Sequence, residues 1–305
     1  PPVTAQAKVR LRAAGFTDPY VETTADFQIA GSITVATPSS SWKIDKACSV
    51  TWTKVGTYSQ GVNIWLSKDG GSTWGTQIGE EESETSPFTD WTVEGPPVSG
   101  LCKLKIASYQ WPEITSISTV FSIGAGITLV APTVGETWNV GEALVDTQDT
   151  GTPRIAWTTD GIDDGVKKVK VLLSTNSGGT WTSLGEVLAT SSPFTGWTVI
   201  PPIKTGEVKI NIVSSDWDSI SATSGLFNIA GSITVDTPGT WNIGEPCSVT
   251  WSKTGTYAGG VNILLSRDNG VTFPTKLNLT PQPDNGSYTG WIVTGPLGAD
   301  TKVKV

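Results

Sequence analysis

The stretch CSVTWSKTGTYAGGVNILLSRD, residues 247–268, is closely repeated as CSVTWTKVGTYSQGVNIWLSKD at residues 48–69. Both copies hold two short apolar segments separated by a glycine-containing turn, and apolar and polar residues alternate within the segments. Alternation with a period of two predicts β-strands, because successive side chains of a strand point to opposite faces. No part of the chain shows the sustained apolar spacing of three and four residues that a helix requires, so we expect an all-β protein.

The same order of landmarks occurs three times along the chain. Each copy has a junction like FNIAGSITV, a tryptophan before a turn, a strand that ends in tryptophan and a hairpin. The junctions begin at Phe27, Phe121 and Phe227. The strand tryptophans Trp52, Trp157 and Trp251 are 157−52=105 and 251−157=94 residues apart. Each unit is therefore about a hundred residues long, and the close match of the first and third units gives a longer period of 251−52=199 residues.

A unit of this length contains about seven short strands with frequent turn residues, which is typical of an immunoglobulin-like β-sandwich. In the first complete unit the predicted strands are 32–35, 48–52, 61–67, 88–93, 101–108 and 118–123. The repeated tryptophans are expected to fill the core. Junctions of only two or three residues, Ala-Gly or Gly-Ala-Gly, are expected to keep neighbouring domains in contact, so the predicted fold is a set of tandem sandwiches in an extended rod.

The repeat divides the chain into four segments. They are 1–31, the closing strands of a partial immunoglobulin-like domain; 32–125 and 126–231, two complete domains; and 232–305, a domain without its last strand. Pro1-Pro2 matches Pro201-Pro202, and the middle domain has extra residues around 143–153. Two hypotheses follow: the chain is a window on a longer repeat protein, or residues 1–30 of one molecule complete the third domain of another by strand addition.

The composition excludes several classes of function. The chain carries 20 Lys+Arg and 28 Asp+Glu, a formal net charge of −8, which argues against nucleic acid or an anionic membrane as a partner. Its lack of histidine removes Ser-His-Asp and Cys-His catalysis and imidazole metal sites. No apolar run approaches the roughly 18 residues of a membrane span. The lack of methionine suits an oxidising location outside the cell.

Four quoted stretches carry a resemblance to a known family. They are GSITVDTPGTWNIGEPCSVTWSKTG (231–255), VNILLSRDNGVTF (261–273), YTGWIV (288–293) and TSGLFNI (223–229). In these residues the chain resembles the tandem immunoglobulin-like repeats of secreted bacterial surface proteins, which are related to the immunoglobulin-like domain of fungal cell-wall-synthesis proteins. The resemblance implies β-sandwich domains that act as spacers, adhesins or accessory modules. SWKIDK (41–46) departs from it, because members usually have glycine after this tryptophan.

The stretch SKDGGSTW, Ser67–Trp74, resembles the Asp-box of sialidases, and similar stretches begin at Ser174 and Ser266. Such boxes are structural in sialidases, and the four arginines of this chain lie in different units instead of clustering around a substrate carboxylate. We therefore interpret the motif as a tight hairpin turn whose last aromatic residue folds back over the core, and we expect no enzyme activity. The turn residues are Ser67, Asp69, Gly71, Thr73, Trp74, Ser174, Asn176, Gly178, Thr180, Trp181, Ser266, Asp268, Gly270, Thr272 and Phe273.

Two further groups of residues leave alternatives open. Cys48 and Cys102 have the inward parity and placement of an inter-sheet disulfide, and the alternative is that both are free buried thiols. Cys247 has Thr301 at its partner position. The acidic loops 80–84 and 160–165 could bind calcium, but neither has EF-hand spacing, and solvated loops are the favoured interpretation. We predict no catalytic, cofactor-binding or metal-binding residue.

Trp65, Trp111 and Trp217 do not fit the core pattern. They could cover a domain junction, contact another subunit or stack on a sugar. The leading functional hypothesis is a non-enzymatic extracellular structural protein, the shaft of a surface fibre, filament, stalk or adhesin. The alternative is a carbohydrate-binding accessory module of a secreted polysaccharide-active enzyme. Expected partners are further copies of the repeat or a glycan, with no cofactor, no nucleic acid and no membrane insertion in this segment.

Overall fold

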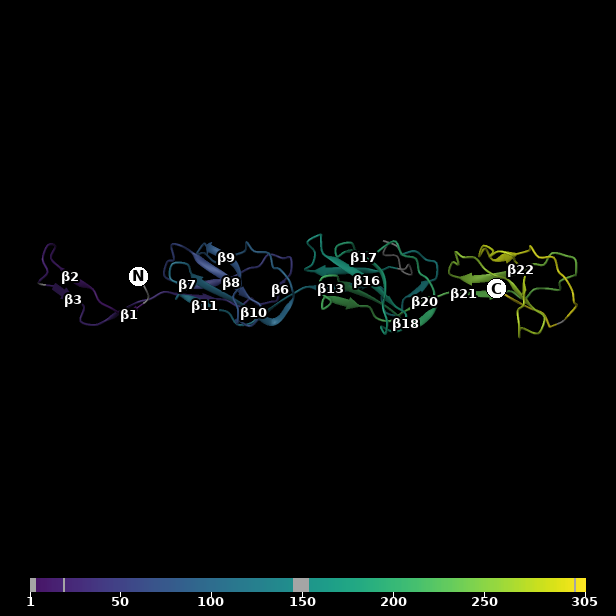
Figure 1. Cartoon of the computed structure of the whole chain (residues 1–305), viewed down its shortest axis with the longest axis horizontal. Helices are drawn as coiled ribbons and strands as arrows, with labels where there is room; N and C mark the ends of the chain where they lie inside the picture. Colours follow the sequence, from purple (N-terminus) through teal and green to yellow (C-terminus); the bar gives the residue numbers. More distant parts are fainter. Residues whose placement is uncertain (1–3, 19, 145–153, 299) are drawn as a thin grey trace. The chain divides into compact units, whose positions relative to one another are not determined.

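The computed structural model describes residues 4–18, 20–144, 154–298 and 300–305, and strands and connecting loops make up all of these ranges (Figure 1). The prediction of an all-β, tandem sandwich protein is confirmed. The chain divides into two compact units, Pro1–Gly126 with Asp160–Asp164, and Ile127–Thr159 with Gly165–Val305. We call residues 32–125, 126–231 and 232–305 the first, second and third domains, and residues 4–31 the N-terminal segment.

The first domain is a sandwich of two β-sheets. One sheet pairs two strands, β5 (Ser32–Val35) and β7 (Trp52–Val55). The other has the order β6 (Trp42–Lys43), β12 (Phe121–Gly124), β10 (Val98–Ser108), β8 (Val62–Ser67) and β9 (Thr76–Glu82), with β11 (Thr115–Ile117) also on β10. Within it, the short edge strand β6 runs parallel to β12. Only isolated bridges, such as Val50 to Phe88, represent the predicted strand 88–93.

Alternating burial along β8 and β10 shows why these residues form strands. Ile64, Leu104 and Ile106 are fully buried, whereas Lys103 and Lys105 in β10 are only half-buried. The edge strand β6 contributes Trp42, whose ring lies 4.8 Å from that of Phe121. Burying a large ring removes about 150–250 Å² from water, on the order of 4–6 kcal/mol of transfer free energy before entropy is subtracted. The tryptophan therefore closes one end of the core.

The second domain repeats this architecture. Its small sheet pairs β13 (Gly126–Ala131) with β15 (Ala156–Asp160). Its large sheet has the order β14 (Thr137–Asn139), β20 (Phe227–Ala230), β18 (Lys204–Ser214), β16 (Lys168–Ser174) and β17 (Thr182–Leu188), with β19 (Ser221–Thr223) also on β18. Trp138 is fully buried 4.5 Å from the ring of Phe227. Of the extra residues predicted around 143–153, residues 145–153 lie outside the described ranges.

The third domain has two three-stranded sheets. They are β21 (Ser232–Val235), β22 (Val249–Thr254) and β25 (Ser287–Tyr288), and β24 (Thr275–Lys276), β23 (Leu264–Ser266) and β26 (Lys302–Lys304). Among the described residues of this domain, no strand takes the place that β12 and β20 occupy in the other two. Trp241, the equivalent of Trp42 and Trp138, is accordingly only half-buried and contacts Trp291 at 6.2 Å.

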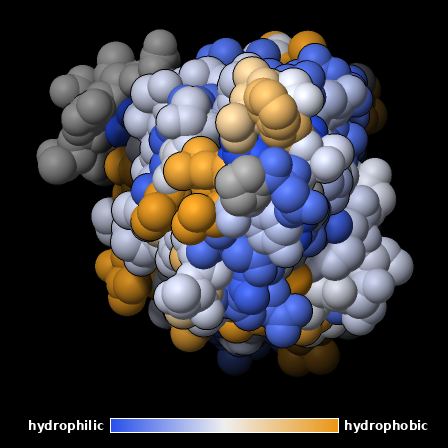
Figure 2. All heavy atoms as spheres, turned by 90° about the vertical axis from the view of Figure 1, so that its left-hand side faces the viewer, coloured by the Kyte–Doolittle hydropathy of each residue, from blue (hydrophilic) through white to orange (hydrophobic). Residues whose placement is uncertain are grey.

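The N-terminal segment forms two pairs of short strands, β1 (Thr4–Ala7) with β4 (Phe27–Ile29) and β2 (Arg10–Arg12) with β3 (Tyr20–Glu22). Thr4 pairs with Ile29 in the register in which Lys204 pairs with Ile229. The predicted match of Pro1-Pro2 lies outside the described residues. On the face of the molecule that carries β2 and β3, apolar side chains lie at the surface among hydrophilic ones (Figure 2). These strands therefore have the pairing of closing strands, and Leu11, Val21 and Phe27 on them are exposed.

Candidate functional site

The Asp-box-like turn after β8 is held by its own side chains. The Ser67 hydroxyl donates to Asp69 at 2.6 Å and accepts from the amide of Gly71 at 2.8 Å. Asp69 also accepts from the Thr73 amide and hydroxyl, at 2.9 and 2.6 Å. Donation from the Ser67 and Thr73 hydroxyls holds the pKa of the Asp69 carboxyl far below its usual range. The Asp69 carboxylate therefore serves as the hydrogen-bond acceptor that stabilises the turn.

The equivalent turns of the second and third domains have the same geometry. Ser266 and Thr272 each donate a hydroxyl to Asp268 at 2.6 Å, and these bonds, from Ser266 first, lower the pKa of Asp268 to about 2. In the second domain an amide replaces the carboxylate: Asn176 accepts from Ser174 at 2.9 Å and from the amide of Thr180 at 2.8 Å. Because the neutral amide of Asn176 accepts the same hydrogen bonds, the three turns do not all require a negative charge at this position. The glycines Gly71, Gly178 and Gly270 all have positive φ.

The aromatic residue that ends each turn lies differently from the prediction that it folds over the core. Trp74 is half-buried on the outer face of the large sheet, where the Lys105 ammonium lies 4.9 Å from its ring and 4.4 Å from that of Trp65. The cause is strand parity, since Lys105 stands between the inward-facing Leu104 and Ile106. Phe273 of the third domain has Lys304 at 5.6 Å, and Trp181 of the second is half-buried.

Trp111 belongs to the junction between the N-terminal segment and the first domain. Its ring packs edge-on against Tyr58 at 6.1 Å, and the two rings line a small pocket with Ile29 and Gly31. The Tyr58 hydroxyl is 2.9 Å from the carbonyl of Ser32, to which it donates. This packing favours the junction alternative for Trp111. Trp217 is half-buried, with the Lys167 ammonium 5.8 Å from its ring.

The three cysteines are buried free thiols, so the disulfide considered between Cys48 and Cys102 is absent from the structure. Both residues are buried, as their inward parity predicts. Burial raises the pKa of the Cys48 thiol to about 11, and it also raises the pKa of Cys102 and of Cys247.

We expect these thiols to react slowly in the folded protein. Iodoacetamide added without reductant at neutral pH should leave Cys48, Cys102 and Cys247 unmodified, and the same treatment in denaturant should add three labels, as counted by intact mass. Since the folded pKa of Cys48 is raised, its contribution to stability is present below the thiol's ordinary pKa and is lost as pH rises toward about 11. Two fewer labels in denaturant would show that the disulfide forms in solution.

The two acidic loops use their carboxylates in ion pairs. Of residues 80–84, which were predicted to form a loop, residues 80–82 belong to β9. Glu84 lies 2.6 Å from the Lys54 ammonium and accepts from the amide of Tyr58, and these partners lower its pKa. Asp160 pairs with Lys43 at 2.7 Å, and Asp163 pairs with Lys46. Within the described ranges no group of three or more His, Cys, Asp or Glu side chains is arranged to hold a metal ion. Nor does any helix there have the length and apolarity to cross a membrane.

A glycine loop that the sequence analysis missed holds the junction between the second and third domains. The amide of Thr256 donates to the carbonyl of Val140 at 2.6 Å. The preceding Gly255 has φ +91°, and a Cβ there would lie 2.7 Å from the same carbonyl oxygen. Only glycine permits this approach. Val140 is consequently buried, with 4% of its side chain exposed.

The same contact occurs inside the other compact unit. Gly161, with φ +82°, lies against Ile44 so closely that a Cβ would be 2.8 Å from the Ile44 carbonyl oxygen, and Ile44 is fully buried. Gly161 and Gly255 each follow a strand tryptophan by four residues, as does Gly56 in the first domain. The repeated glycine four residues after the strand tryptophan could have indicated this contact from the sequence. We call the turn that receives the glycine, at Ile44 and Val140, the docking turn; its equivalent in the third domain is Ile243.

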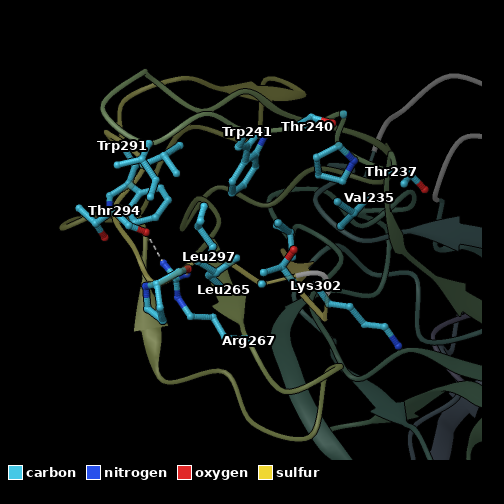
Figure 3. Close-up of a pocket in the computed structure, with 18 of the residues that line it drawn as sticks. Val235, Thr237, Thr240, Trp241, Leu265, Arg267, Trp291, Thr294, Leu297 and Lys302 are labelled. Carbon is cyan, nitrogen blue, oxygen red and sulfur yellow. Dashed lines mark hydrogen bonds between the residues drawn. The ribbon is translucent and has the colours of Figure 1, made fainter.

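The third domain has an open groove of about 810 Å³, lined by both apolar and polar residues (Figure 3). Trp241 and Trp291 stand along one side, and Leu265 and Leu297 lie below them (Figure 3). Arg267 donates to the carbonyls of Thr294 and Pro296, both at 2.6 Å, and so holds the loop at one end. Ile243 also lines the groove and is 55% exposed, unlike the buried Ile44 and Val140.

No protein family matches the sequence, and no curated protein matches it. Among solved structures the chain is similar to the Down Syndrome Cell Adhesion Molecule (DSCAM) isoform 1.30.30, N-terminal eight Ig domains, at 13% identity and a TM-score of 0.21 over 95% of this chain. It spans only 35% of that chain. It is also similar to Dscam1 isoform 9.44, N-terminal four Ig domains, at 8% identity and a TM-score of 0.18 over 90% of this chain and 70% of that one. At such TM-scores the assignment of tandem β-sandwiches rests on the sheets described above.

Proposed function

We propose that this chain is a non-enzymatic structural repeat protein outside the cell, the shaft of a surface fibre, filament, stalk or adhesin. One observation carries the proposal: the glycine loop packs on the docking turn in both compact units, at Gly161 with Ile44 and at Gly255 with Val140. In the compact unit that contains the second and third domains, this contact holds neighbouring domains together. A junction locked by backbone contacts resists bending, which is the property a shaft requires.

The polar groups support the same proposal. The Asp-box-like carboxylates accept hydrogen bonds from the side chains of their own turns. In the acidic stretches, Glu84 pairs with Lys54 and Asp160 pairs with Lys43. The sequence has no histidine, and its acidic balance keeps such a repeat apart from nucleic acids. These side chains are used to build the domains and their junctions, which is what a structural repeat needs.

Substitution of the junction glycine tests this function. We expect Gly255→Ala to loosen the junction between the second and third domains, because the new Cβ would meet the Val140 carbonyl at 2.7 Å. Small-angle X-ray scattering should then show a broader distribution of maximum dimensions. The matched control is Gly56→Ala: φ is +98° there, but the nearest atom to the new Cβ is 3.8 Å away. Equal scattering from wild type and Gly255→Ala, with a broad distribution in both, would contradict the shaft proposal.

Carbohydrate binding is the second candidate, and the cluster on the outer face of the first domain favours it. Trp65 and Trp74 are half-buried there on either side of Lys105, and exposed indole rings are surfaces on which sugars stack. Retention on one polysaccharide, lost in Trp65→Ala and kept in Trp111→Ala, would move the assignment to an accessory module. Trp111 is the matched control because its ring already packs on Tyr58.

A further inference from the structure

The sequence contains two Asn-Gly dipeptides, Asn269-Gly270 and Asn285-Gly286, and both lie in the third domain directly after an aspartate. In such a dipeptide the next backbone nitrogen can attack the asparagine side chain, because glycine has no Cβ to obstruct the approach. Both asparagines are exposed, and both glycines have positive φ, +87° at Gly270 and +89° at Gly286. The two dipeptides therefore match in sequence context, exposure and glycine conformation, and they differ in their hydrogen bonds.

Asn269-Gly270 is held on both sides by the Asp-box-like turn. The Gly270 amide donates to the Ser266 hydroxyl at 2.7 Å, and Ser266 is fully buried. The Asn269 amide donates to the carbonyl of Asp300 at 2.8 Å. The nitrogen that would attack the Asn269 side chain already donates to a buried acceptor, so a reaction there requires the turn to open first.

Asn285-Gly286 has no such restraint on its glycine nitrogen. In the described part of the chain the Gly286 amide donates to no acceptor, and only its carbonyl is bonded, by the Trp251 amide at 3.0 Å. One atom of the Asn285 side-chain amide lies 3.4 Å from the Ser287 amide nitrogen, so this side chain extends over the Gly286 peptide group. The Gly286 nitrogen can therefore approach the side chain without first breaking a hydrogen bond of its own.

We propose that Asn285-Gly286 is a site of spontaneous deamidation, and that the turn protects Asn269-Gly270 from the same reaction. The Gly286 nitrogen forms a bond to the side-chain carbonyl carbon of Asn285, and the bond from that carbon to the amide nitrogen breaks. The proton of the Gly286 nitrogen leaves with the amide nitrogen as ammonia. Water then opens the cyclic imide at either carbonyl and leaves aspartate or isoaspartate. Water is the only co-reactant, and no electrons are transferred.

Asp284, the neighbour of Asn285, anchors the glycine loop that packs on the second domain. It accepts from the Tyr257 amide at 2.6 Å and lies 2.6 Å from the Lys253 ammonium. The residue before Tyr257 is Thr256, whose amide makes the contact between the second and third domains described above. A chemical change beside Asp284 therefore acts on a residue next to that contact.

Deamidation would weaken this anchor in two ways. The new carboxylate at residue 285 repels Asp284 and competes with it for Lys253, because like charges at short range disfavour each other. Isoaspartate also lengthens the main chain between residues 285 and 286 by one methylene, and the Gly286 carbonyl is fixed by the Trp251 amide. Asp284 is thereby displaced from the Tyr257 amide, and we expect that amide to lose protection from hydrogen exchange.

The first domain contains an equivalent anchor without the reactive dipeptide. Glu84 lies 2.6 Å from the Lys54 ammonium and accepts from the Tyr58 amide, but Thr85 and Ser86 follow it in the sequence. This anchor is a matched control within the same chain. Conditions that deamidate Asn-Gly should leave hydrogen exchange of the Tyr58 amide unchanged.

Incubation of the folded 305-residue chain in warm, mildly alkaline buffer tests the proposal, with peptide mapping by mass spectrometry at each site. We expect Asn285 to deamidate at least roughly fivefold faster than Asn269, the factor that one intact hydrogen bond gives. In denaturant the two rates should become similar, because only the fold distinguishes the sites. Ser266→Ala should raise the rate at Asn269, since it removes the acceptor of the Gly270 amide.

Asn285→Gln is the control for the effect on the anchor. Its side chain is one methylene longer and cyclises far more slowly, so the incubated variant should keep the protection of the Tyr257 amide. Incubated wild type should lose that protection in proportion to the deamidated fraction. Hydrogen exchange read by mass spectrometry at residues 255–257 measures both.

Two results would overturn the assignment of the site: equal rates at Asn269 and Asn285 in the folded protein, or an Asn285 that reacts only in denaturant. Unchanged exchange of the Tyr257 amide in deamidated protein would overturn the effect on the anchor. The shaft proposal would stand in each case, because Gly255→Ala alters the junction without deamidation.

Discussion

Replacing Trp138 by alanine should cost about 3–5 kcal/mol of unfolding free energy, the largest loss expected from one side chain in the second domain. Trp138 is fully buried, packs on Phe227 at 4.5 Å and on Trp197 at 6.5 Å, and its indole N–H donates to Glu136 at 2.8 Å. The substitution removes this apolar surface and leaves a cavity between β14 and β20. Urea denaturation measures the loss, and hydrogen exchange followed by mass spectrometry should localise it to the second domain.

Trp241→Ala is the matched control. The equivalent side chain is half-buried beside an open groove and packs on Trp291 alone among the aromatic rings described, so its truncation should cost about 1–2 kcal/mol. The comparison isolates the contribution of the strand that covers the tryptophan. Equal losses for the two substitutions would contradict the open groove in the isolated molecule.

Gly61→Ala should cost about 2–5 kcal/mol, because two penalties add. The residue has φ +77°, which a side chain disfavours, and a Cβ would lie 2.1 Å from the carbonyl oxygen of Glu82 on the neighbouring strand β9. The backbone of β8 or β9 must therefore move. Gly260 has the same place in the third domain, with φ +72° and the Gln282 carbonyl oxygen at 2.4 Å from a Cβ.

Gly70→Ala separates the two penalties. Gly70 has nearly the same backbone conformation, φ +76°, but no atom lies within 4 Å of the position of its Cβ. Its substitution should cost only the conformational strain, about 1–2 kcal/mol. Thermal and urea denaturation of both variants give the difference. If Gly61→Ala were no worse than Gly70→Ala, the close approach of β8 and β9 would be wrong.

The alternating segments predicted much of the fold. The strands predicted at 32–35, 61–67 and 101–108 correspond to β5, β8 and β10. The prediction works because alternate side chains of a half-buried strand point to the core and to solvent, so apolar and polar residues alternate in the sequence. The segment 88–93 was also predicted as a strand from its alternation, but it forms only isolated bridges. The hydrogen bonds among Ser67, Asp69 and Thr73 could also be predicted, because they join residues within eight positions of one another in the sequence.

The sequence by itself determined the all-β class, the repeat and the internal hydrogen bonds of the turns, because period, spacing and local hydrogen bonding are properties of neighbouring residues. Tertiary structure alone decided that Trp74 faces outward beside Lys105, that Cys48 and Cys102 are separate thiols, and that Gly161 and Gly255 meet the docking turns. It also decided that the groove at Trp241 is open. These features depend on which distant segments of the chain come within a few ångströms of each other, and the local sequence of one segment does not determine such contacts.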